Sequence, residues 1–284
     1  MAVKRILWLI TMACLSVSLY TIVMSRSAVK KTDIIFGGYE SVYVGTEHAS
    51  SVDPNAEEEV VDDGLNWPDI DITLPQYSLV NADNLLSSAY MPDIAVKEDG
   101  ETIDPIYGTR YQAFDSSAKP YLDQMLQDME KEGFTPYIAS SYRTYSYQNQ
   151  LFNTKATGIY MEMGYDAQDW ASEEYQAAVE KAKKYTAVAG ASEHQLALAV
   201  DIWDCQRQKL SAYTNMDENF RYWLEENSCN YGFIQRYPSR KCLITGWDEP
   251  WHYRYVGIEV AKFMKETGIS YEEFYHHYVP SYQY

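Results

Sequence analysis

The stretch Ser192-Glu193-His194-Gln195-Leu196-Ala197-Leu198-Ala199-Val200-Asp201 is the part of the sequence that decides the fold. From Leu196 it continues to Trp203 with the alternating pattern that is typical of a strand. Side chains along a strand point alternately to its two faces. We therefore expect Asp201 to point inward at the far end of this strand, with His194 on the loop before it.

Further short segments predict three more strands, at 137–140, 232–237 and 252–256. Helical patterns predict helices at 147–154, 169–186, 220–224 and 258–267. Ser116 and Ser117 can cap one more helix, which ends at Gly133 and whose apolar face consists of Leu122, Met125, Leu126 and Met129. The helices and strands do not alternate as regular βαβ units. We therefore predict an α+β fold with helices packed on a small antiparallel sheet.

Glu249-Pro250-Trp251-His252 is a second unusual segment, because it combines a carboxylate with one of only five histidines. A catalytic zinc site takes about three protein ligands from histidine and carboxylate and leaves one position for water. His194, Asp201 and His252 supply that set. Glu249 lies three residues before His252 and can serve as the general base that takes a proton from the attacking water.

Each of these residues taken alone has an ordinary structural interpretation, as a hydrogen-bonded core histidine or as a helix cap. The scarcity of histidine favours a metal site, because two of the five histidines fall in the two unusual segments. We interpret His276 and His277 as surface or packing residues, and His48 as part of a polar stalk.

The N-terminus contains a candidate transmembrane helix. Lys4 and Arg5 precede the uncharged apolar run 6–24, whose 19 residues approach the roughly 20 that span a bilayer. Basic residues before the run favour a cytoplasmic N-terminus and an extracellular remainder in a single-pass membrane protein. The alternative is a signal peptide that is cleaved before Ala28, which would release a secreted protein.

An acidic segment follows the apolar run. No Lys or Arg occurs between Lys31 and Lys97, and the formal net charge of the chain is -18. Such a segment repels itself and buries little apolar surface, so we expect an extended stalk. The charge also argues against binding to nucleic acid. We place a membrane anchor at 1–25, the stalk at 26–66 and one folded domain, expected to be a monomer, at 67–284.

The four cysteines include no Cys-x-x-Cys pair, so a thiolate zinc site is not supported. Cys14 lies in the apolar run. Cys229 and Cys242 bracket the strand at 232–237 and could form a disulfide in an oxidising compartment. Free buried thiols are an equal alternative for this pair, and Cys205 is the rival partner for either cysteine.

Four segments together resemble the zinc D-alanyl-D-alanine carboxypeptidases of the VanY type. They occur in family order and spacing, and they are Ser140-Ser141-Tyr142-Arg143, 192–201, 232–238 and Glu249-Pro250-Trp251-His252. The resemblance begins near Ser78 and covers essentially all of the chain after the stalk. It implies the α+β fold of the LAS-type zinc peptidases, Zn²⁺ as the cofactor, and peptidoglycan stem peptides as the substrate.

The resemblance also implies a role for each residue of the site. The implied zinc ligands are His194, Asp201 and His252. Glu249 would pass a proton from water to the amine of the leaving D-alanine. Arg143, Gln148 and Ser192 would bind the terminal carboxylate of the substrate or its reacting carbonyl.

One departure from the family concerns Leu196-Ala197, which stands where the family usually has Thr-Gly. Alanine costs little there only if the backbone avoids positive φ.

Related proteins with the same motifs act as L,D-carboxypeptidases on tetrapeptide stems, and no residue here decides between the two activities. A non-catalytic wall-binding relative or a zinc-dependent signalling domain is less favoured, because a binding module has no use for the base Glu249.

Overall fold

The computed structural model describes residues 64–95, 113–166, 170–204 and 216–284. The apolar run at 6–24, most of the expected stalk and Cys205 lie outside the described residues. Within the part of the chain that is described, no helix is long and apolar enough to cross a bilayer.

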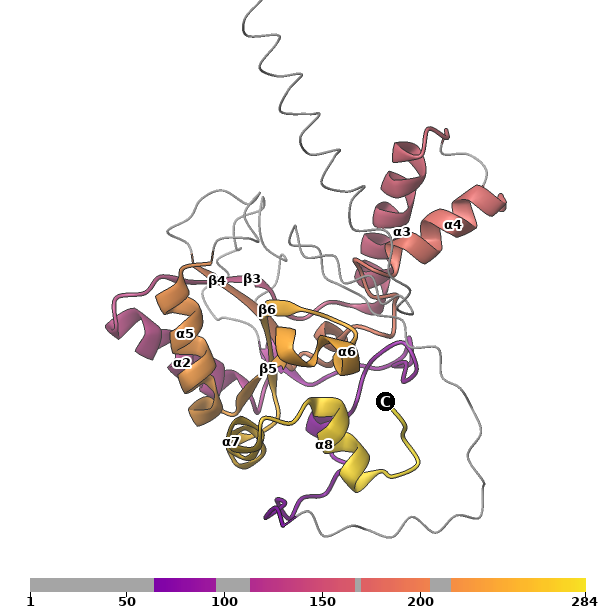
Figure 1. Cartoon of the computed structure of the whole chain (residues 1–284). Helices are drawn as coiled ribbons and strands as arrows, with labels where there is room; N and C mark the ends of the chain where they lie inside the picture. Colours follow the sequence, from indigo (N-terminus) through magenta and orange to yellow (C-terminus); the bar gives the residue numbers. More distant parts are fainter. Residues whose placement is uncertain (1–63, 96–112, 167–169, 205–215) are drawn as a thin grey trace, which may run out of the picture. The chain divides into compact units, whose positions relative to one another are not determined.

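A four-stranded antiparallel sheet forms the centre of the domain (Figure 1). In spatial order its strands are β3 (Pro136–Ser140), β4 (Ala199–Asp204), β6 (Glu249–Tyr255) and β5 (Phe233–Tyr237). A separate antiparallel pair consists of β1 (Ile94–Ala95) and β2 (Phe114–Asp115). These sheets and the helices around them confirm the predicted α+β class.

The α-helices among the described residues are α2 (Lys119–Lys131), α3 (Tyr145–Glu162), α4 (Glu173–Ala182), α5 (Glu218–Asn227), α6 (Cys242–Thr245), α7 (Ile258–Thr267) and α8 (Tyr271–Tyr278). All of them except the short α6 pack in three groups. Helices α2 and α5 contribute to the main core, α7 and α8 to a second apolar cluster, and α3 and α4 form a hairpin with its own apolar contacts (Figure 1). Short 3-10 helices occur at Pro75–Tyr77, Glu193–Leu196, Ser228–Tyr231 and Ser239–Lys241.

The two faces of the sheet have different chemistry. Val200 and Ile202 of β4 are fully buried in the main core, together with Tyr253 of β6. Because side chains alternate along a strand, their neighbours Asp201 and His252 are directed to the other face. One face of the sheet is therefore apolar core, and the opposite face carries the polar side chains of the site.

Some predicted boundaries were wrong. The strand predicted from Leu196 begins at Ala199, because Leu196 ends a 3-10 helix and Ala197 has left-handed backbone angles. Strand β6 begins at Glu249, three residues before the predicted start. Helix α3 is longer than predicted and α4 is shorter, and the predicted start of the latter at Asp169 lies outside the described residues.

The predicted serine cap of α2 was also wrong. The helix begins after Ala118, which makes no side-chain cap. Instead, one carboxylate oxygen of Asp115 accepts hydrogen bonds from the backbone N–H groups of Ser117 (2.9 Å) and Ala118 (3.2 Å). Asp115 thus fixes the turn that leads into the helix, and no serine side chain caps it.

Helix α8 was not predicted. Ser270 and Glu273 form a capping box at its start, in which each side chain bonds to the backbone N–H of the other residue. His277 of this helix stacks on Trp67 with ring centroids 3.6 Å apart, in line with its interpretation as a packing residue.

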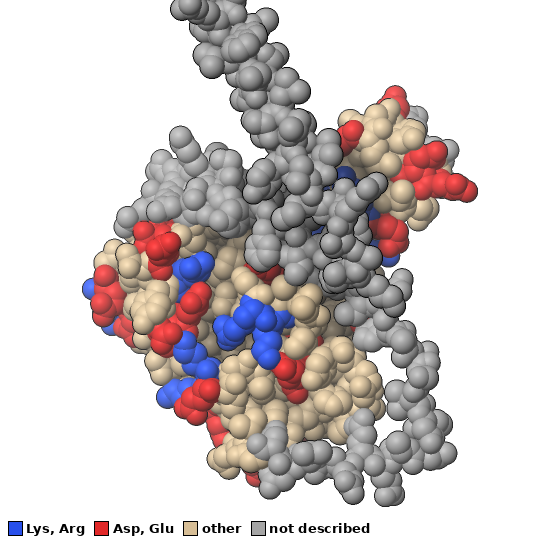
Figure 2. Space-filling model, viewed as in Figure 1, with Lys and Arg blue, Asp and Glu red and all other residues tan. Residues whose placement is uncertain are grey.

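The thiols of Cys229 and Cys242 are free, so the disulfide considered for this pair is not present. Acidic and basic residues share the surface of the domain. Figure 2 shows Asp and Glu side chains spread over one face with Lys and Arg side chains between them.

Candidate metal centre

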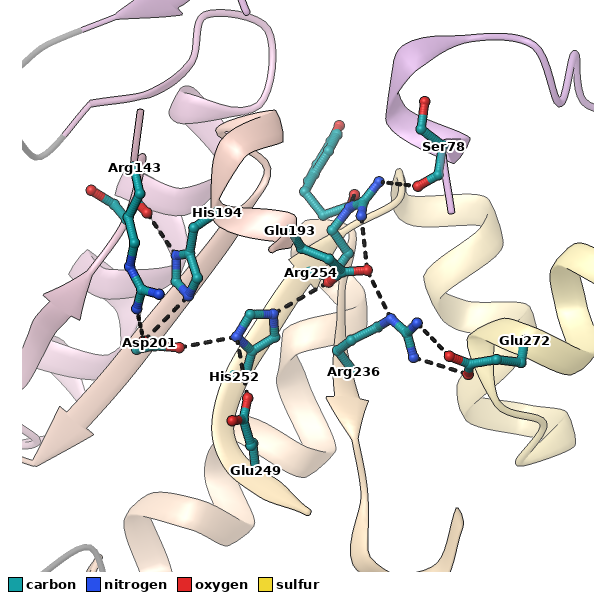
Figure 3. A network of polar contacts seen from close by, with 12 residues as sticks. Ser78, Arg143, Glu193, His194, Asp201, Arg236, Glu249, His252, Arg254 and Glu272 are labelled. Carbon is teal, nitrogen blue, oxygen red and sulfur yellow. Dashed lines mark hydrogen bonds and ion pairs between the residues drawn. The ribbon is translucent and has the colours of Figure 1, made fainter. Parts of the chain in front are cut away.

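Strand register brings two of the predicted ligands together. Asp201 of β4 and His252 of β6 are direct cross-strand partners, and Asp201 Oδ1 lies 3.1 Å from His252 Nδ1. His194 comes from the 3-10 helix before β4, and its Nε2 lies 3.3 Å from Asp201 Oδ2 (Figure 3). All three side chains are buried, and their ligand atoms lie within 4.8 Å of one another.

The donor set fits a zinc ion. His194 Nδ1 lies 2.6 Å from the carbonyl oxygen of Ser141, which can only accept, so this nitrogen carries the proton. The lone pair of Nε2 is then directed toward Asp201. Two imidazole nitrogens and one carboxylate match the number and type of protein ligands in catalytic zinc sites.

The pKa values of the three candidate ligands are shifted by burial and by neighbouring charges. Burial lowers the pKa of His194 to about 4, with a further contribution from Arg143, so the imidazole is neutral as a ligand must be. Burial alone would raise the pKa of Asp201, but His194 and His252 hold it well below its usual range. Burial alone would lower the pKa of His252, but Asp201 and Glu193 raise it to about 9. A metal ion that binds His252 therefore displaces a proton.

Glu249 lies beside the three ligands, at the start of β6. Its Oε2 is 3.7 Å from His252 Nδ1, and 17% of its side chain is exposed. Burial raises the pKa of Glu249 to about 7, and the nearby Asp201 carboxylate contributes to the increase. A carboxyl group with a pKa near neutrality is suited to accept a proton and give it up again.

Arg143 lies beside the second carboxylate oxygen of Asp201, Oδ2, while His252 lies beside Oδ1. Its guanidinium donates to Ser140 Oγ (2.9 Å), to Gln148 Oε1 (3.1 Å) and to Asp201 Oδ2 (3.4 Å). The side chain is still 19% exposed. Arg143 is therefore fixed in direction by protein groups while part of it remains accessible to a ligand.

Gln148 and Ser192 are buried close to these residues. Gln148 accepts from Arg143 and donates to the carbonyl oxygen of Ala187 (2.7 Å), so both ends of its amide bind protein groups. Ser192 precedes the 3-10 helix that carries His194 and makes no capping hydrogen bond. Direct contact of either side chain with a substrate stays a prediction.

The departure at Leu196-Ala197 has a backbone cost. Ala197 adopts φ 60° and ψ 20°, and it is the only non-glycine residue with positive φ among the described residues. A left-handed conformation costs an alanine roughly 1–2 kcal/mol. The condition under which alanine would be inexpensive is therefore not met at this position between His194 and Asp201.

Glu193 is a residue of the site that the sequence motifs did not single out. It is fully buried, and its Oε2 lies 3.2 Å from His252 Nε2, on the opposite side of the ring from Asp201. Arg236 and Arg254 contact its other oxygen. The available signal was a charged residue placed directly beside a ligand, in a segment that is otherwise mostly apolar.

Comparison with known proteins finds relatives of this chain. A D-alanyl-D-alanine carboxypeptidase of Enterococcus faecalis (strain ATCC 700802 / V583) is 36% identical over 197 residues, which are 69% of this chain and 64% of the relative. The matched part thus spans less than two thirds of that relative.

Two solved structures share the fold. A vancomycin-resistance D,D-pentapeptidase VanY from a VanB-type cassette, in complex with Zn(II), has a TM-score of 0.56 at 34% identity, covering 71% of this chain and 99% of that one. The LD-carboxypeptidase LdcB, whose structure addresses peptidoglycan recognition, has a TM-score of 0.56 at 28% identity, covering 75% of this chain and 94% of that one.

The family profile described as VanY, D-alanyl-D-alanine carboxypeptidase, matches residues 112–258, a range that contains the metal centre, Glu249 and Arg143. More than half of the chain lies in this match. The chain therefore belongs to the VanY family of D-alanyl-D-alanine carboxypeptidases.

Proposed function

We propose that this chain is a zinc-dependent D,D-carboxypeptidase that removes the terminal D-alanine from peptidoglycan stem peptides. The observation that carries the proposal is the convergence of three ligand atoms within 4.8 Å, from His194, Asp201 and His252, with Glu249 beside them. A binding module would need neither a free coordination position nor a carboxyl group with a pKa near 7.

The residues around the metal divide the work. Zinc, when bound, polarises the scissile carbonyl and lowers the pKa of the attacking water. Glu249 accepts the proton of that water and returns it to the nitrogen of the leaving D-alanine. Arg143 is held by Ser140 and Gln148 so that its planar guanidinium can bind a carboxylate or a developing oxyanion.

The test is direct analysis of products. The zinc-loaded full-length protein is incubated with pentapeptide and tetrapeptide stems, and the products are identified by mass spectrometry. We expect loss of one D-alanine from the pentapeptide, and no reaction after the metal is removed with a chelator. Cleavage within the peptide, or undiminished hydrolysis without metal, would contradict the proposal.

An L,D-carboxypeptidase is the second candidate, because the similarity to LdcB is as high in TM-score as the similarity to the D,D-pentapeptidase. An L,D-carboxypeptidase would act on the tetrapeptide stem and leave the pentapeptide unchanged. The same incubation therefore separates the two candidates.

We also propose that the apolar run 6–24 anchors the protein in the cell membrane, with the catalytic domain outside the cell. Its 19 uncharged residues behind Lys4 and Arg5 support this location. We expect a C-terminally tagged full-length chain to stay in the membrane fraction after an alkaline wash. A tagged protein that is released into the medium, with its N-terminus at Ala28, would show that the run is a cleaved signal. Sedimentation in detergent should show a monomer.

A further inference from the structure

A carboxylate with two arginine partners lies at the Nε2 side of His252, the side of the ring that faces away from Asp201. Glu193 is 1% exposed, and its Oε2 lies 3.2 Å from His252 Nε2. Its Oε1 accepts from Arg236 Nε at 2.8 Å and lies 3.0 Å from Arg254 Nη1 (Figure 3). Both arginines are permanently charged and can only donate, so their contacts with Oε1 favour the ionised form of the Glu193 carboxylate. Glu193 is therefore an ionised acceptor.

The two arginines are in turn held from outside the metal site. Arg236 makes a bidentate pair with Glu272 of α8, at 2.5 Å and 3.0 Å. Arg254 donates to the carbonyl oxygens of Gln76 and Ser78 at 3.0 Å and 3.2 Å. The two arginines and two glutamates are at most 2% exposed and their charges cancel. Such a group is rigid because every charge in it has a fixed partner.

This arrangement determines which nitrogen of His252 can bind a metal. An ionised carboxylate only accepts hydrogen bonds, so the nitrogen that faces Glu193 must carry the proton. The proton that a metal ion displaces from His252 is therefore the one on Nδ1, whose lone pair is then presented on the side of Asp201, where His194 also points. Hydrogen bonds of this kind orient ligand histidines and raise their affinity for metal ions.

We propose that Glu193 is a positioning residue for the metal ligand His252, and that Glu272 of α8 acts on the same ligand through Arg236. The inference rests on the zinc site of the proposed function and extends it to residues that do not touch zinc or substrate. Glu272 lies outside the matched range 112–258, so the C-terminal helix is part of the support of the metal site although the family profile ends before it.

The experiment measures zinc affinity of the full-length protein by competition with a chromophoric chelator. Glu193→Asp keeps the charge beside the two arginines but withdraws the carboxylate from His252, and we expect zinc to bind about 10- to 100-fold more weakly. Glu272→Gln leaves Glu193 in place and should give a smaller but measurable loss. The visible absorption of the Co²⁺-substituted protein should change in both variants, because the direction of the His252 ring changes.

Glu273→Gln is the matched control. Glu273 lies next to Glu272 on α8, and its pair with Lys241 (2.7 Å) is similar in length but does not reach the metal site. Glutamine can still serve in the capping box. We expect this variant to lose some thermal stability and to bind zinc with unchanged affinity.

Unchanged zinc affinity in folded Glu193→Asp would overturn the inference, since a purely structural glutamate would lower stability alone. If Glu193→Asp does not fold, Glu272→Gln decides: weaker zinc binding than in Glu273→Gln supports the inference, and equal binding overturns it. A wild-type protein that binds no zinc would overturn the proposed function itself, and the wild-type measurement therefore separates the two failures.

Discussion

Two carboxylates, the buried Glu193 and the half-buried Glu249, flank the same imidazole and have opposite electrostatic surroundings. Glu193 lies 3.2 Å from His252 Nε2, and two arginines hold its pKa well below the usual range. Glu249 lies 3.7 Å from His252 Nδ1, and no arginine among the described residues is recorded in an ion pair with it. Burial raises its pKa to about 7. The difference shows that charge partners, more than burial, decide whether the pKa of a carboxyl group beside this imidazole is lowered or raised.

The largest effect should come from removing the proton-exchanging carboxylate. Glu249→Gln keeps the shape of the side chain but cannot accept a proton, so we expect kcat to fall roughly 10²–10⁴-fold. Zinc content should stay at the wild-type level, because Glu249 is not in the ligand set. Rates with stem peptides and metal analysis of the same sample test both statements. Near-normal turnover would remove Glu249 from the mechanism.

Disruption of the buried ion pairs around Glu193 should lower the stability of the protein. Arg236→Met leaves Glu193 and Glu272 buried without their shared partner, which destabilises a protein by about 3–5 kcal/mol. Lys183→Met, which breaks an exposed pair with Glu180, should cost about 0–1 kcal/mol. Denaturant unfolding of both variants makes the comparison. Equal costs would show that the buried network contributes no more than a surface pair.

The stability of the metal-free protein should also distinguish the two carboxylates. When the pKa of a carboxyl group is higher in the folded than in the unfolded state, the protein becomes less stable as pH rises between the two pKa values. For Glu249 the upper end of this range is about pH 7. Glu249→Gln should therefore stabilise the metal-free protein at pH 8 by about 1–3 kcal/mol and have little effect at pH 4. Glu193→Gln should have the opposite sign at pH 8, because the pKa of Glu193 is lowered. Unfolding curves at both pH values test this, and a gain that does not depend on pH would contradict it.

Arg143, which is partly exposed, should bind the C-terminal carboxylate of the substrate. A charge-assisted contact with Arg143 contributes about 1.5–3 kcal/mol, or roughly 10- to 100-fold in kcat/KM. A stem peptide amidated at its C-terminus should be cleaved more slowly by that factor, and Arg143→Lys should narrow the difference because a point charge replaces a planar fork. Equal kcat/KM for acid and amide would favour an endopeptidase.

The smallest expected change is in protein stability, and it comes from the backbone of Ala197, between His194 and Asp201. Ala197→Gly relieves the left-handed strain at φ 60° but makes the unfolded chain more flexible, so the net gain in stability should reach about 1 kcal/mol at most. Ala199→Gly, in the regular strand that follows, should be destabilising. Thermal unfolding of the two variants tests the contrast, and a loss at Ala197 as large as at Ala199 would refute the strain.

Local patterns were sufficient for the sheet and for the three residues whose candidate ligand atoms converge. Short apolar segments placed all four strands of the central sheet, although two boundaries were off by three residues. Histidine is scarce, so His194 and His252 stood out, and antiparallel pairing put His252 opposite Asp201. Helix α8 was missed although its capping box, Ser270 with Glu273 three residues later, was readable.

The support of the site could not be read from the sequence. Glu193 and Arg236 are 43 residues apart, and Arg236 and Glu272 are 36 apart. No local period relates such positions, and each charge taken alone looks like an ordinary surface residue. The strain at Ala197 was equally hidden, because the sign of φ depends on how the 3-10 helix joins β4.

The contact between Arg236 and Glu272 sets an order of events while the chain is being synthesised. All three metal ligands have left the ribosome before Glu272, so the nascent chain holds a complete set of zinc donors whose support is unfinished. On the role proposed for Glu272, firm capture of zinc would then wait until α8 has folded and Glu272 reaches Arg236. For an enzyme with the proposed activity, this order would delay hydrolysis until the domain around the metal has assembled.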